Sequence, residues 1–600
     1  MTEYRPPLDD INFTLNHVAD LPAVAKLNGF QHIDSDTVEG ILAEAGRFFS
    51  EVMAPLNRTG DEEGSVLTDD GTVRTPEGFR DAYAKYVDAG WGGAHVPAEH
   101  GGGGLPYTVG IVIQEMFKTA NMAFSLCPLL TQAAIEALVQ HGTDQQRADY
   151  LEHLVTGEWA GTMCLTEPQA GSDVGALSTR AVRQDDGSYR LTGTKIFITW
   201  GDQDLTENII HLVLARTPDA PPGTKGISMF VVPKYLLDDQ GRPTERNDIT
   251  TVSLEHKLGI HASPTCVLSF GEEGEGAIGY LIGEEESGMR YMFTMMNTAR
   301  IGVGVEGLAI TEGAYQKATS YARERLQGRE VGAPATEVSP IVRHPDVRRM
   351  LMTMRAYREA LRSLIYLTAR YVDEEDHSDT AEAREAAGEM VALLTPITKA
   401  WPTDIGVEMA SLGIQVHGGM GFIEETGAAQ FYRDSRIAPI YEGTNGIQAI
   451  DLVLRKLPMA GGEVIERLLA EVRRVAEELS HVGRLEDFGM HLEDGVEAVE
   501  EGVDVLLSRL ESSPNDALAG ATPFLRLLGT VTGGWLMGKS ALAASRLLEA
   551  GEGDEDFLRA KLATACFYGE QLLPSSLGLI ESVTSDATLL YAIPDDSLAI

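Results

Sequence analysis

The stretch Tyr441-Glu442-Gly443-Thr444-Asn445-Gly446 decides how the rest of this sequence is interpreted. It follows an apolar run and precedes renewed helical spacing, with Glu442 as a lone acid between the two. A carboxylate held against apolar neighbours has a raised pKa and can act as a base near neutral pH. Gly443 would let the backbone pass close to a ligand. The simpler interpretation is a helix start capped by Thr444 or Asn445, and the loop alone favours it.

Bulk composition excludes several classes of protein. A chain of 600 residues is too long for one core, so we expect two to four domains. Its formal net charge of −42 argues against nucleic-acid or anionic-membrane partners, which need clustered Lys and Arg. The four cysteines, Cys127, Cys164, Cys266 and Cys566, form no CxxC pair. This pattern predicts a reducing cytosol, without a disulfide framework or a zinc cluster.

The sequence also predicts no membrane insertion and a cytoplasmic location. The first residues contain no apolar signal core. A spanning helix needs about 18 uncharged apolar residues, and no window supplies them. The nearest window, 522–548, is interrupted by Arg526, Lys539 and four glycines, and we interpret it as a buried helix pair.

Hydrophobic periodicity divides the chain into segments of different character. Helical spacing dominates from Asp36, gives way near Gly157 to short β-branched runs bounded by turns, and returns at Ser287. The fold class is therefore mainly α with a central β-domain. We expect an N-terminal arm (1–35), an all-helical domain (36–156), a β-domain (157–282), a helical bundle (283–458) with helices at 287–327, 343–373, 381–400 and 403–417, and a C-terminal helical extension (459–600).

Two motifs in the predicted β-domain could contact a planar ligand. Leu165-Thr166-Glu167-Pro168-Gln169-Ala170-Gly171-Ser172-Asp173 offers small residues and hydroxyls in one loop, although turn chemistry alone explains such a string about as well. Gly193-Thr194-Lys195-Ile196-Phe197-Ile198-Thr199-Trp200 predicts a strand with Phe197 and Thr199 on one face. An aromatic ring and a hydroxyl on one face could stack on and hydrogen-bond to a ring system. An ordinary amphipathic strand remains the alternative.

Three further motifs occur in the predicted bundle. Arg300-Ile301-Gly302-Val303 begins a long helix that later carries Tyr321-Ala322-Arg323-Glu324-Arg325. Those arginines are either surface charge or phosphate ligands. Gln415-Val416-His417-Gly418-Gly419-Met420-Gly421-Phe422 ends a helix in glycines, which is a C-cap pattern with room for close approach.

In this order, these motifs resemble those of the acyl-CoA dehydrogenase flavoproteins across about residues 36–456. The C-terminal extension and the opening MTEYRPPLDDINFTL resemble the longer bacterial branch of that family. The resemblance implies a helical domain, a β-barrel or sandwich domain and a four-helix-bundle domain, with FAD as cofactor. It also implies a homodimer, with electron transfer flavoprotein as electron acceptor.

By this resemblance, Glu442 removes the α-proton of an acyl-CoA thioester while the β-hydrogen leaves as hydride to the flavin. Arg325 and Gln415 are expected to come from the neighbouring subunit, and Phe197 and Trp200 replace the commoner Trp and Asn. Oxygen access would make the same site an acyl-CoA oxidase, and loss of activity would leave a scaffold protein. The implied contacts are, for FAD, Leu165, Thr166, Gly171, Ser172, Phe197, Thr199, Arg325, Gln415, Gly418, Gly419, Thr444 and Asn445, and, for substrate, Ser172, Arg300, Tyr441 and Gly443.

Overall fold

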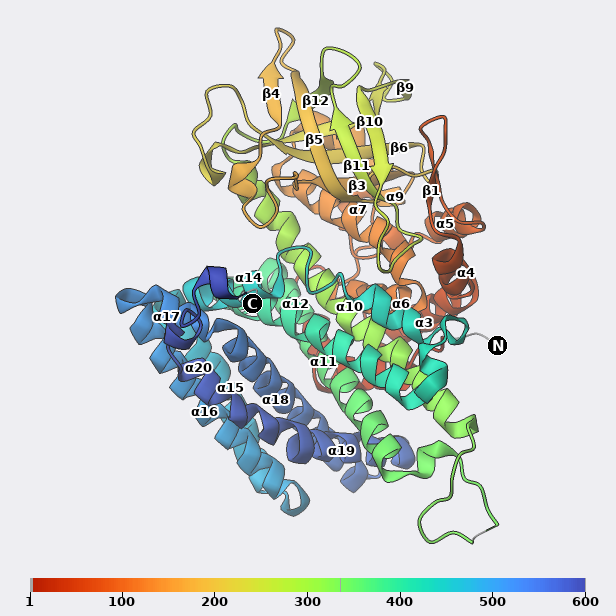
Figure 1. Cartoon of the computed structure of the whole chain (residues 1–600), viewed down its shortest axis with the longest axis vertical. Coiled ribbons are helices and arrows are strands. Elements are labelled where there is room, and N and C mark those ends of the chain that lie inside the picture. Colours follow the sequence, from red (N-terminus) through yellow and green to blue (C-terminus); the bar gives the residue numbers. More distant parts are fainter. Residues whose placement is uncertain (1–3, 335, 599–600) are drawn as a thin grey trace. The chain divides into compact units, whose positions relative to one another are not determined.

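The computed structural model describes residues 4–334 and 336–598 (Figure 1). The ends of the predicted arm and extension, residues 1–3 and 599–600, lie outside the described residues. The chain forms two compact units: Met1–Pro6 with Glu44–Gly302, and Pro7–Ala43 with Val303–Ile600. Two helices, α3 (Ser35–Phe48) and α10 (Gly288–Glu324), continue from one unit into the other. The mainly helical fold with a central β-domain is confirmed.

The first unit combines helices with a single large sheet. Its main helices are α4 (Pro55–Glu63), α5 (Phe79–Asp88), α6 (Tyr107–Ala120), α7 (Met122–His141) and α9 (Glu152–Thr156). A short hairpin of β1 (Val66–Leu67) and β2 (Val73–Arg74) interrupts the region predicted to be all-helical. Helix α7 is long and apolar enough to cross a membrane, but 89% of its apolar window is buried inside the protein. It packs on the sheet, where Gly161 leaves room for Ala134.

The sheet has eight strands in the order β10-β11-β5-β12-β7-β6-β3, with β4 pairing with β5. All pairs are antiparallel except β3 with β6. Apolar clusters lie on both faces of the sheet, where β3, β6 and β7 are buried along their whole length, whereas β4, β5, β10 and β12 also contain exposed residues. The strands are β3 (Trp159–Cys164), β4 (Arg180–Arg183), β5 (Tyr189–Thr199), β6 (Asn208–Ala215), β7 (Ser228–Pro233), β10 (Ile249–Leu254), β11 (Thr265–Phe270) and β12 (Ala277–Leu281), with β8 (Tyr235–Leu237) and β9 (Pro243–Arg246) forming a separate hairpin.

The regular elements in the described residues of the second unit are all helices. Its bundle consists of the second half of α10 with α11 (Pro345–His377), α12 (Ala381–His417), α13 (Ala428–Ser435) and α14 (Asn445–Asp451). The arm contributes α1 (Leu8–His17) and α2 (Leu21–Val24). The extension adds α15 (Glu463–Ser480), α16 (Glu486–Ser512), α17 (Pro514–Ala519), α18 (Ala521–Ala550), α19 (Glu555–Phe567) and α20 (Ile580–Thr584).

Two expected helix breaks are absent. The predicted helices 381–400 and 403–417 form one helix, α12, which continues through Pro402. Proline removes the N–H that the Thr398 carbonyl would have accepted, and that carbonyl lies against Gly304 of α10 instead. Likewise, 522–548 is one helix, α18, and not a pair. Close contact with large side chains explains its glycines, since Gly529 and Gly533 both lie against Trp401.

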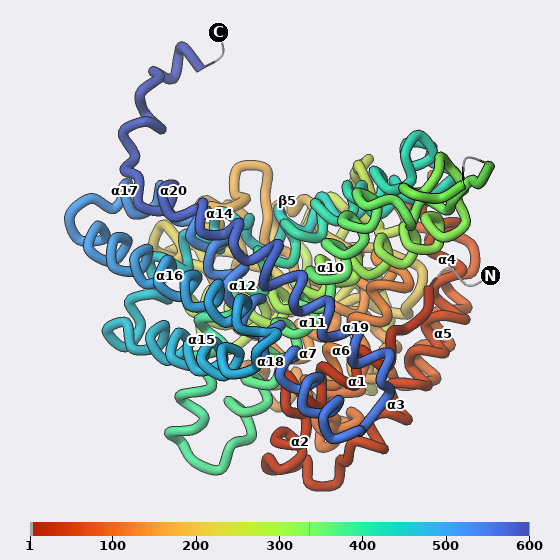
Figure 2. The backbone as a smooth tube through the Cα atoms, turned by 90° about the horizontal axis from the view of Figure 1, so that it is seen from below, coloured from red at the N-terminus to blue at the C-terminus, as the bar shows by residue number. Residues whose placement is uncertain are grey.

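The extension packs on the bundle, as Figure 2 shows for α18 beside α11 and α12. A buried charge cluster, defined here as Asp10, Glu312, Arg358, Glu359, Arg362 and Lys561, joins the arm, α10, α11 and α19. Lys561 Nζ donates to Asp10 at 2.7 Å and to Glu359 at 2.8 Å. Arg362 donates to Asp10 and, at 2.6 Å, to Glu312. The N-terminal arm and the C-terminal extension therefore contact each other in the same buried cluster.

Candidate active site

Glu442 lies in a loop that is held in an unfavourable backbone conformation. Its φ is 54°, in the left-handed region that side-chain-bearing residues rarely adopt, and the next residue, Gly443, has φ 84°. The Gln448 side-chain amide, which is fully buried, donates to the carbonyls of Glu442 and Gly443 at 3.4 and 3.2 Å. Strained backbone persists where its surroundings fix it, and such positions gather at active sites. The loop geometry thus marks Glu442 independently of its chemistry.

Glu442 was expected to be buried among its apolar neighbours, but its own loop does not cover it. Its side chain is only partly buried, and of the apolar run before it Ala438 is buried whereas Ile440 is 51% exposed. The run winds in short turns and does not form a continuous strand or helix, so it presents apolar groups in several directions. Shelter for a functional carboxylate must therefore come from other groups.

Tyr441 directs its hydroxyl at an acid that the sequence analysis did not single out. The Tyr441 hydroxyl donates to Glu306 Oε2, which lies on α10. Burial, and then the Glu306 carboxylate, raise the pKa of Tyr441 well above its ordinary value, so the phenol stays protonated. The substrate contact predicted for Tyr441 would therefore come from its ring, because its hydroxyl is already hydrogen-bonded to Glu306.

Thr444 and Asn445 both have structural roles. Thr444 is the N-cap of α14, and its hydroxyl accepts from the Ile447 N–H at 3.2 Å, as the simpler interpretation predicted. The Asn445 side chain accepts from Lys399 Nζ at 2.8 Å and donates to Ala400 O and to Asp404 Oδ1. This amide fastens α14 to α12, so the flavin contact predicted for Asn445 has to share a side chain that is already engaged.

The glycine-rich end of α12 lies at the surface of its unit. Gln415, Gly418 and Gly419 are exposed, and so is Arg325 at the end of α10. A methyl group added to either glycine would meet nothing within 4 Å. His417, whose role was left open, is buried, stacks on the Tyr321 ring at 4.5 Å and contacts the Gly413 carbonyl through Nδ1 at 2.7 Å. It supports the helix end that presents the other groups.

The two β-domain motifs form an exposed loop beside an irregular strand. Leu165 and Thr166 are partly exposed, and Gly171 and Ser172 are exposed. The expected alternation along β5 is interrupted at Phe197, which has φ 59° and is 58% exposed. An added residue in β5 at this point shifts its register against β11, so period two cannot assign Phe197 and Thr199 to one face. The exposed ring is nevertheless available to a ligand.

Trp200 is removed from that surface. It is fully buried, its indole N–H donates to the Ala123 carbonyl at 3.1 Å, and its ring stacks near Phe124. It therefore anchors the end of β5 on α7. Phe197 is left as the aromatic side chain that this motif offers to a flavin, since a residue buried in the core cannot stack on a bound ring.

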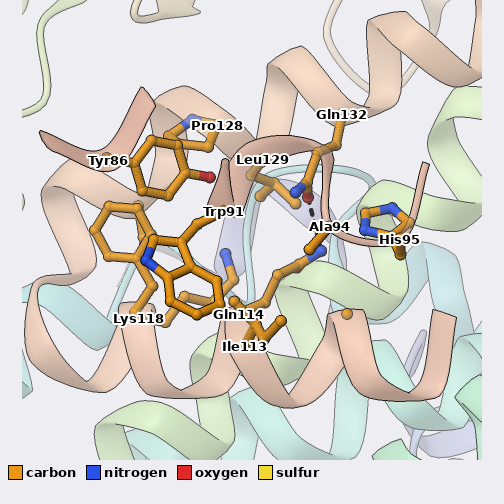
Figure 3. Close-up of a pocket in the computed structure, with 13 residues that line it drawn as sticks. Tyr86, Trp91, Ala94, His95, Ile113, Gln114, Lys118, Pro128, Leu129 and Gln132 are labelled. Carbon is orange, nitrogen blue, oxygen red and sulfur yellow. Dashed lines mark hydrogen bonds between the residues drawn. The ribbon is translucent and has the colours of Figure 1, made fainter. Parts of the chain in front are cut away.

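A cavity in the first unit lies between α6, α7 and the turn at Trp91 (Figure 3). It has about 350 Å³ of empty volume and aromatic walls from Tyr86, Trp91 and Phe117. On its polar side, Gln114 Nε2 donates to Gln132 Oε1 at 2.8 Å, and Gln132 Nε2 donates to the Gly92 carbonyl at 3.1 Å. This volume includes the open space at the mouth of the cavity, so the enclosed part is much smaller.

Helix α10 contacts two of the residues that line this cavity. Gly302 lies against Leu129 and Gln114, and a larger residue at 302 would overlap the Leu129 side chain. Arg300, predicted near the substrate, is buried two residues earlier. His95, which also lines the cavity, has its pKa lowered by burial to about 4, so its imidazole is neutral at pH 7.

Three functional candidates escaped the sequence analysis: Glu306, Gln448 and the pair Gln114–Gln132. Glu306 acquires its role through Tyr441, 135 residues away, and Gln114 and Gln132 acquire theirs through each other across a helix pair. Gln448 instead follows the Glu442 stretch directly and bonds to carbonyls five and six residues before it. Their signal is a buried polar side chain, which a single sequence does not reveal.

Comparison with known proteins agrees with this arrangement. Four family models match in order: "Acyl-CoA dehydrogenase, N-terminal domain" at 35–158, "middle domain" at 162–272, "C-terminal domain" at 286–457 and "Acetyl-CoA dehydrogenase C-terminal like" at 468–594. The 3-methylmercaptopropionyl-CoA dehydrogenase of Ruegeria pomeroyi is 50% identical over 95% of this chain and 96% of its own. A butyryl-CoA dehydrogenase of Syntrophomonas wolfei is 34% identical over 98% of both chains.

A solved Bacillus anthracis acyl-CoA dehydrogenase, complexed with FAD, has the same fold, with a TM-score of 0.72, 22% identity and coverage of 96% of this chain and 91% of its own. The match at 50% identity extends along nearly the whole length of the relative, so the resemblance is not limited to single motifs. The chain belongs to the acyl-CoA dehydrogenase family.

Proposed function

We propose that this protein carries out the FAD-dependent α,β-dehydrogenation of a short acyl-CoA, with Glu442 as the base that removes the α-proton. The observation that carries the assignment of the base is the strained, partly exposed Glu442 loop fixed by Gln448. Membership in the family supports the reaction class, the FAD cofactor and the acyl-CoA substrate.

The described residues fit a bound flavin. In the first unit, the loop at 165–172 and the ring of Phe197 are accessible. In the second unit, neither Gly418 nor Gly419 has atoms where a side chain would lie. FAD, when bound, supplies the acceptor for the β-hydrogen and its electron pair. The chain's own groups bind and orient the cofactor through the loop hydroxyls and the exposed ring.

Proton removal depends on the position and environment of the Glu442 carboxylate. The α-hydrogen of a thioester is weakly acidic, so the enolate charge needs a donor aimed at the carbonyl oxygen. Holding the base in line with the Cα–H bond lowers the entropic part of the activation barrier for proton transfer. Gln448 holds two consecutive carbonyls of the loop, which fixes the direction of the Glu442 side chain before substrate arrives. Bound substrate and cofactor would exclude the water that now reaches the carboxylate.

For the acyl group we propose the cavity in the first unit and a short chain that carries a thioether. The aromatic walls from Tyr86, Trp91 and Phe117 suit a sulfur atom, because sulfur–aromatic contacts contribute about 0.3–1.5 kcal/mol each. The greater identity to the 3-methylmercaptopropionyl-CoA enzyme than to the butyryl-CoA enzyme points the same way.

For the assembly we propose a homodimer in which Arg325 and Gln415 contact the FAD of the neighbouring subunit. Their exposure, together with that of Gly418 and Gly419, supports this assignment. Electron transfer flavoprotein is the proposed acceptor, and slow reoxidation of the reduced enzyme in air would distinguish this dehydrogenase from an oxidase.

The test is an anaerobic flavin-bleaching panel on the purified holoenzyme. Pentanoyl-CoA is the matched control for 3-methylmercaptopropionyl-CoA, because it replaces only the sulfur by CH₂. We expect kcat/KM to be about 2- to 10-fold higher for the sulfur compound, and palmitoyl-CoA to react poorly. Equal or faster reduction by pentanoyl-CoA would exclude the thioether preference. Absence of bleaching by every acyl-CoA would exclude the dehydrogenase.

A further inference from the structure

Within the first unit, a buried ion pair links the two segments that the flavin is expected to contact. Lys195 on β5 is 0% exposed and Glu167 is 2% exposed, and Lys195 Nζ lies 2.9 Å from Glu167 Oε1. The same ammonium donates to the Leu165 carbonyl at 2.9 Å. The pair therefore connects the strand that carries Phe197 to the loop that follows β3.

Glu167 is also the centre of the loop's own hydrogen bonds. Its Oε2 accepts from the N–H and the hydroxyl of Ser178, both at 2.7 Å. Its Oε1 accepts from the N–H of Thr179 at 3.0 Å and from the Thr179 hydroxyl at 2.5 Å. Burial alone would raise the pKa of Glu167, but Lys195 and these donors lower it to about 2. The carboxylate thus stays charged and fixes both ends of the loop.

The irregularity in β5 completes the connection. Lys195 pairs with Leu268 and Ile198 with Cys266, so Ile196 and Phe197 together oppose one residue of β11. The Ile196 N–H donates to the Thr166 carbonyl at 3.0 Å, outside the ladder of the sheet. Phe197 is left exposed at φ 59°. A bulge of this kind redirects a side chain, and such bulges are common next to active sites.

A buried ion pair is weak evidence for stability, because apolar residues of the same size often stabilise a fold equally well. Here its contacts converge on the loop and the bulge, which contain the predicted flavin contacts Leu165, Thr166, Gly171, Ser172, Phe197 and Thr199. We propose that Glu167 and Lys195 are positioning residues for FAD, which hold this loop and strand in the binding geometry before the cofactor arrives. The inference rests on the proposed function, since it takes these segments as the flavin site.

The experiment measures FAD affinity on deflavinated full-length protein, by titration with FAD, for the parent and for Lys195→Met and Glu167→Gln. Residues that orient metal ligands typically contribute about 10- to 100-fold in affinity, and we take the same range for residues that hold a cofactor-binding loop. We expect the FAD Kd to rise by that factor in Lys195→Met and less in Glu167→Gln, which keeps most acceptor contacts. The resolved shoulders of the bound flavin's visible absorption band should also become smoother in both variants.

Asn247→Leu is the control for a general loss of stability. Asn247 is 5% exposed, and its amide donates to the carbonyls of Pro233 and Ile278, away from the loop at 165–173. We expect it to lower the melting temperature without changing the FAD Kd or spectrum. Unchanged Kd and spectrum in Glu167→Gln and in any soluble Lys195→Met overturn the proposal, as does an equal rise in Kd for Asn247→Leu. Failure of the parent to bind FAD would instead exclude the proposed function.

Discussion

Replacing Glu442 by Gln isolates the chemistry of the proposed base from the shape of its loop. The two side chains have the same length, and the bonds from Gln448 reach backbone carbonyls, which the substitution leaves in place. The side chain is only partly buried, so the free energy of unfolding should change by no more than about 0.5 kcal/mol. A positioned general base contributes about 10²- to 10⁴-fold to a rate, and we expect a loss of that size in flavin reduction.

The assay is anaerobic stopped-flow bleaching of the bound flavin in a single turnover, which separates the chemical step from reoxidation. FAD content and acyl-CoA affinity are measured on the same samples and should match the parent. Glu425→Gln, which removes an exposed acid from the same unit, is the control and should reduce its flavin at the parent rate. A Glu442→Gln rate within about tenfold of the parent, below the range for general-base loss, would show that Glu442 is not the base.

Three further outcomes follow from buried contacts. Gln448→Leu removes both bonds to the Glu442 loop, and we expect flavin reduction to slow with unchanged FAD content, together with a stability loss of about 1–3 kcal/mol in urea unfolding. Lys561→Met leaves Asp10 and Glu359 buried without this cation and should cost about 3–5 kcal/mol. A milder effect of Lys561→Met in an Asp10→Asn background would confirm the coupling. Burial alone would raise the Asp10 pKa, but Lys561, Arg362 and Arg358 hold it below its ordinary value. The stabilisation that the charged Asp10 adds to the free energy of unfolding is therefore complete above the ordinary carboxyl pKa of about 4 and is lost as the pH falls below it. If the melting temperature of Asp10→Asn falls with decreasing pH as steeply as that of the parent, this reasoning is wrong.

Helical and strand periodicity was sufficient to predict the order of elements. The helix predicted at 287–327 is α10, and the change of character near Gly157 coincides with the start of β3. These predictions depend on residues that are close in sequence, because a helix or a strand buries one face by its own period. The cap at Thr444 was predictable for the same reason.

Predictions that depended on distant contacts were less reliable. Pro402 breaks a helix by its local chemistry, yet α12 continues because its free carbonyl at Thr398 lies against Gly304. The bulge at Phe197 arises from register with β11 and from the Thr166 carbonyl, neither of which a strand pattern contains. In each case tertiary contacts outweigh a local preference.

The buried charge cluster explains why the extension is part of the second unit and not an appended module. Its six members comprise three acids and three cations, so their charges balance inside the fold. Asp10 and Lys561 come from opposite ends of the chain, 551 residues apart, and both contact residues of the bundle. Because removing one partner of a buried ion pair is costly, the presence of α19 stabilises the arm in its observed position on the bundle. The cluster therefore specifies which helices pack together, a task that interchangeable apolar contacts would perform less selectively.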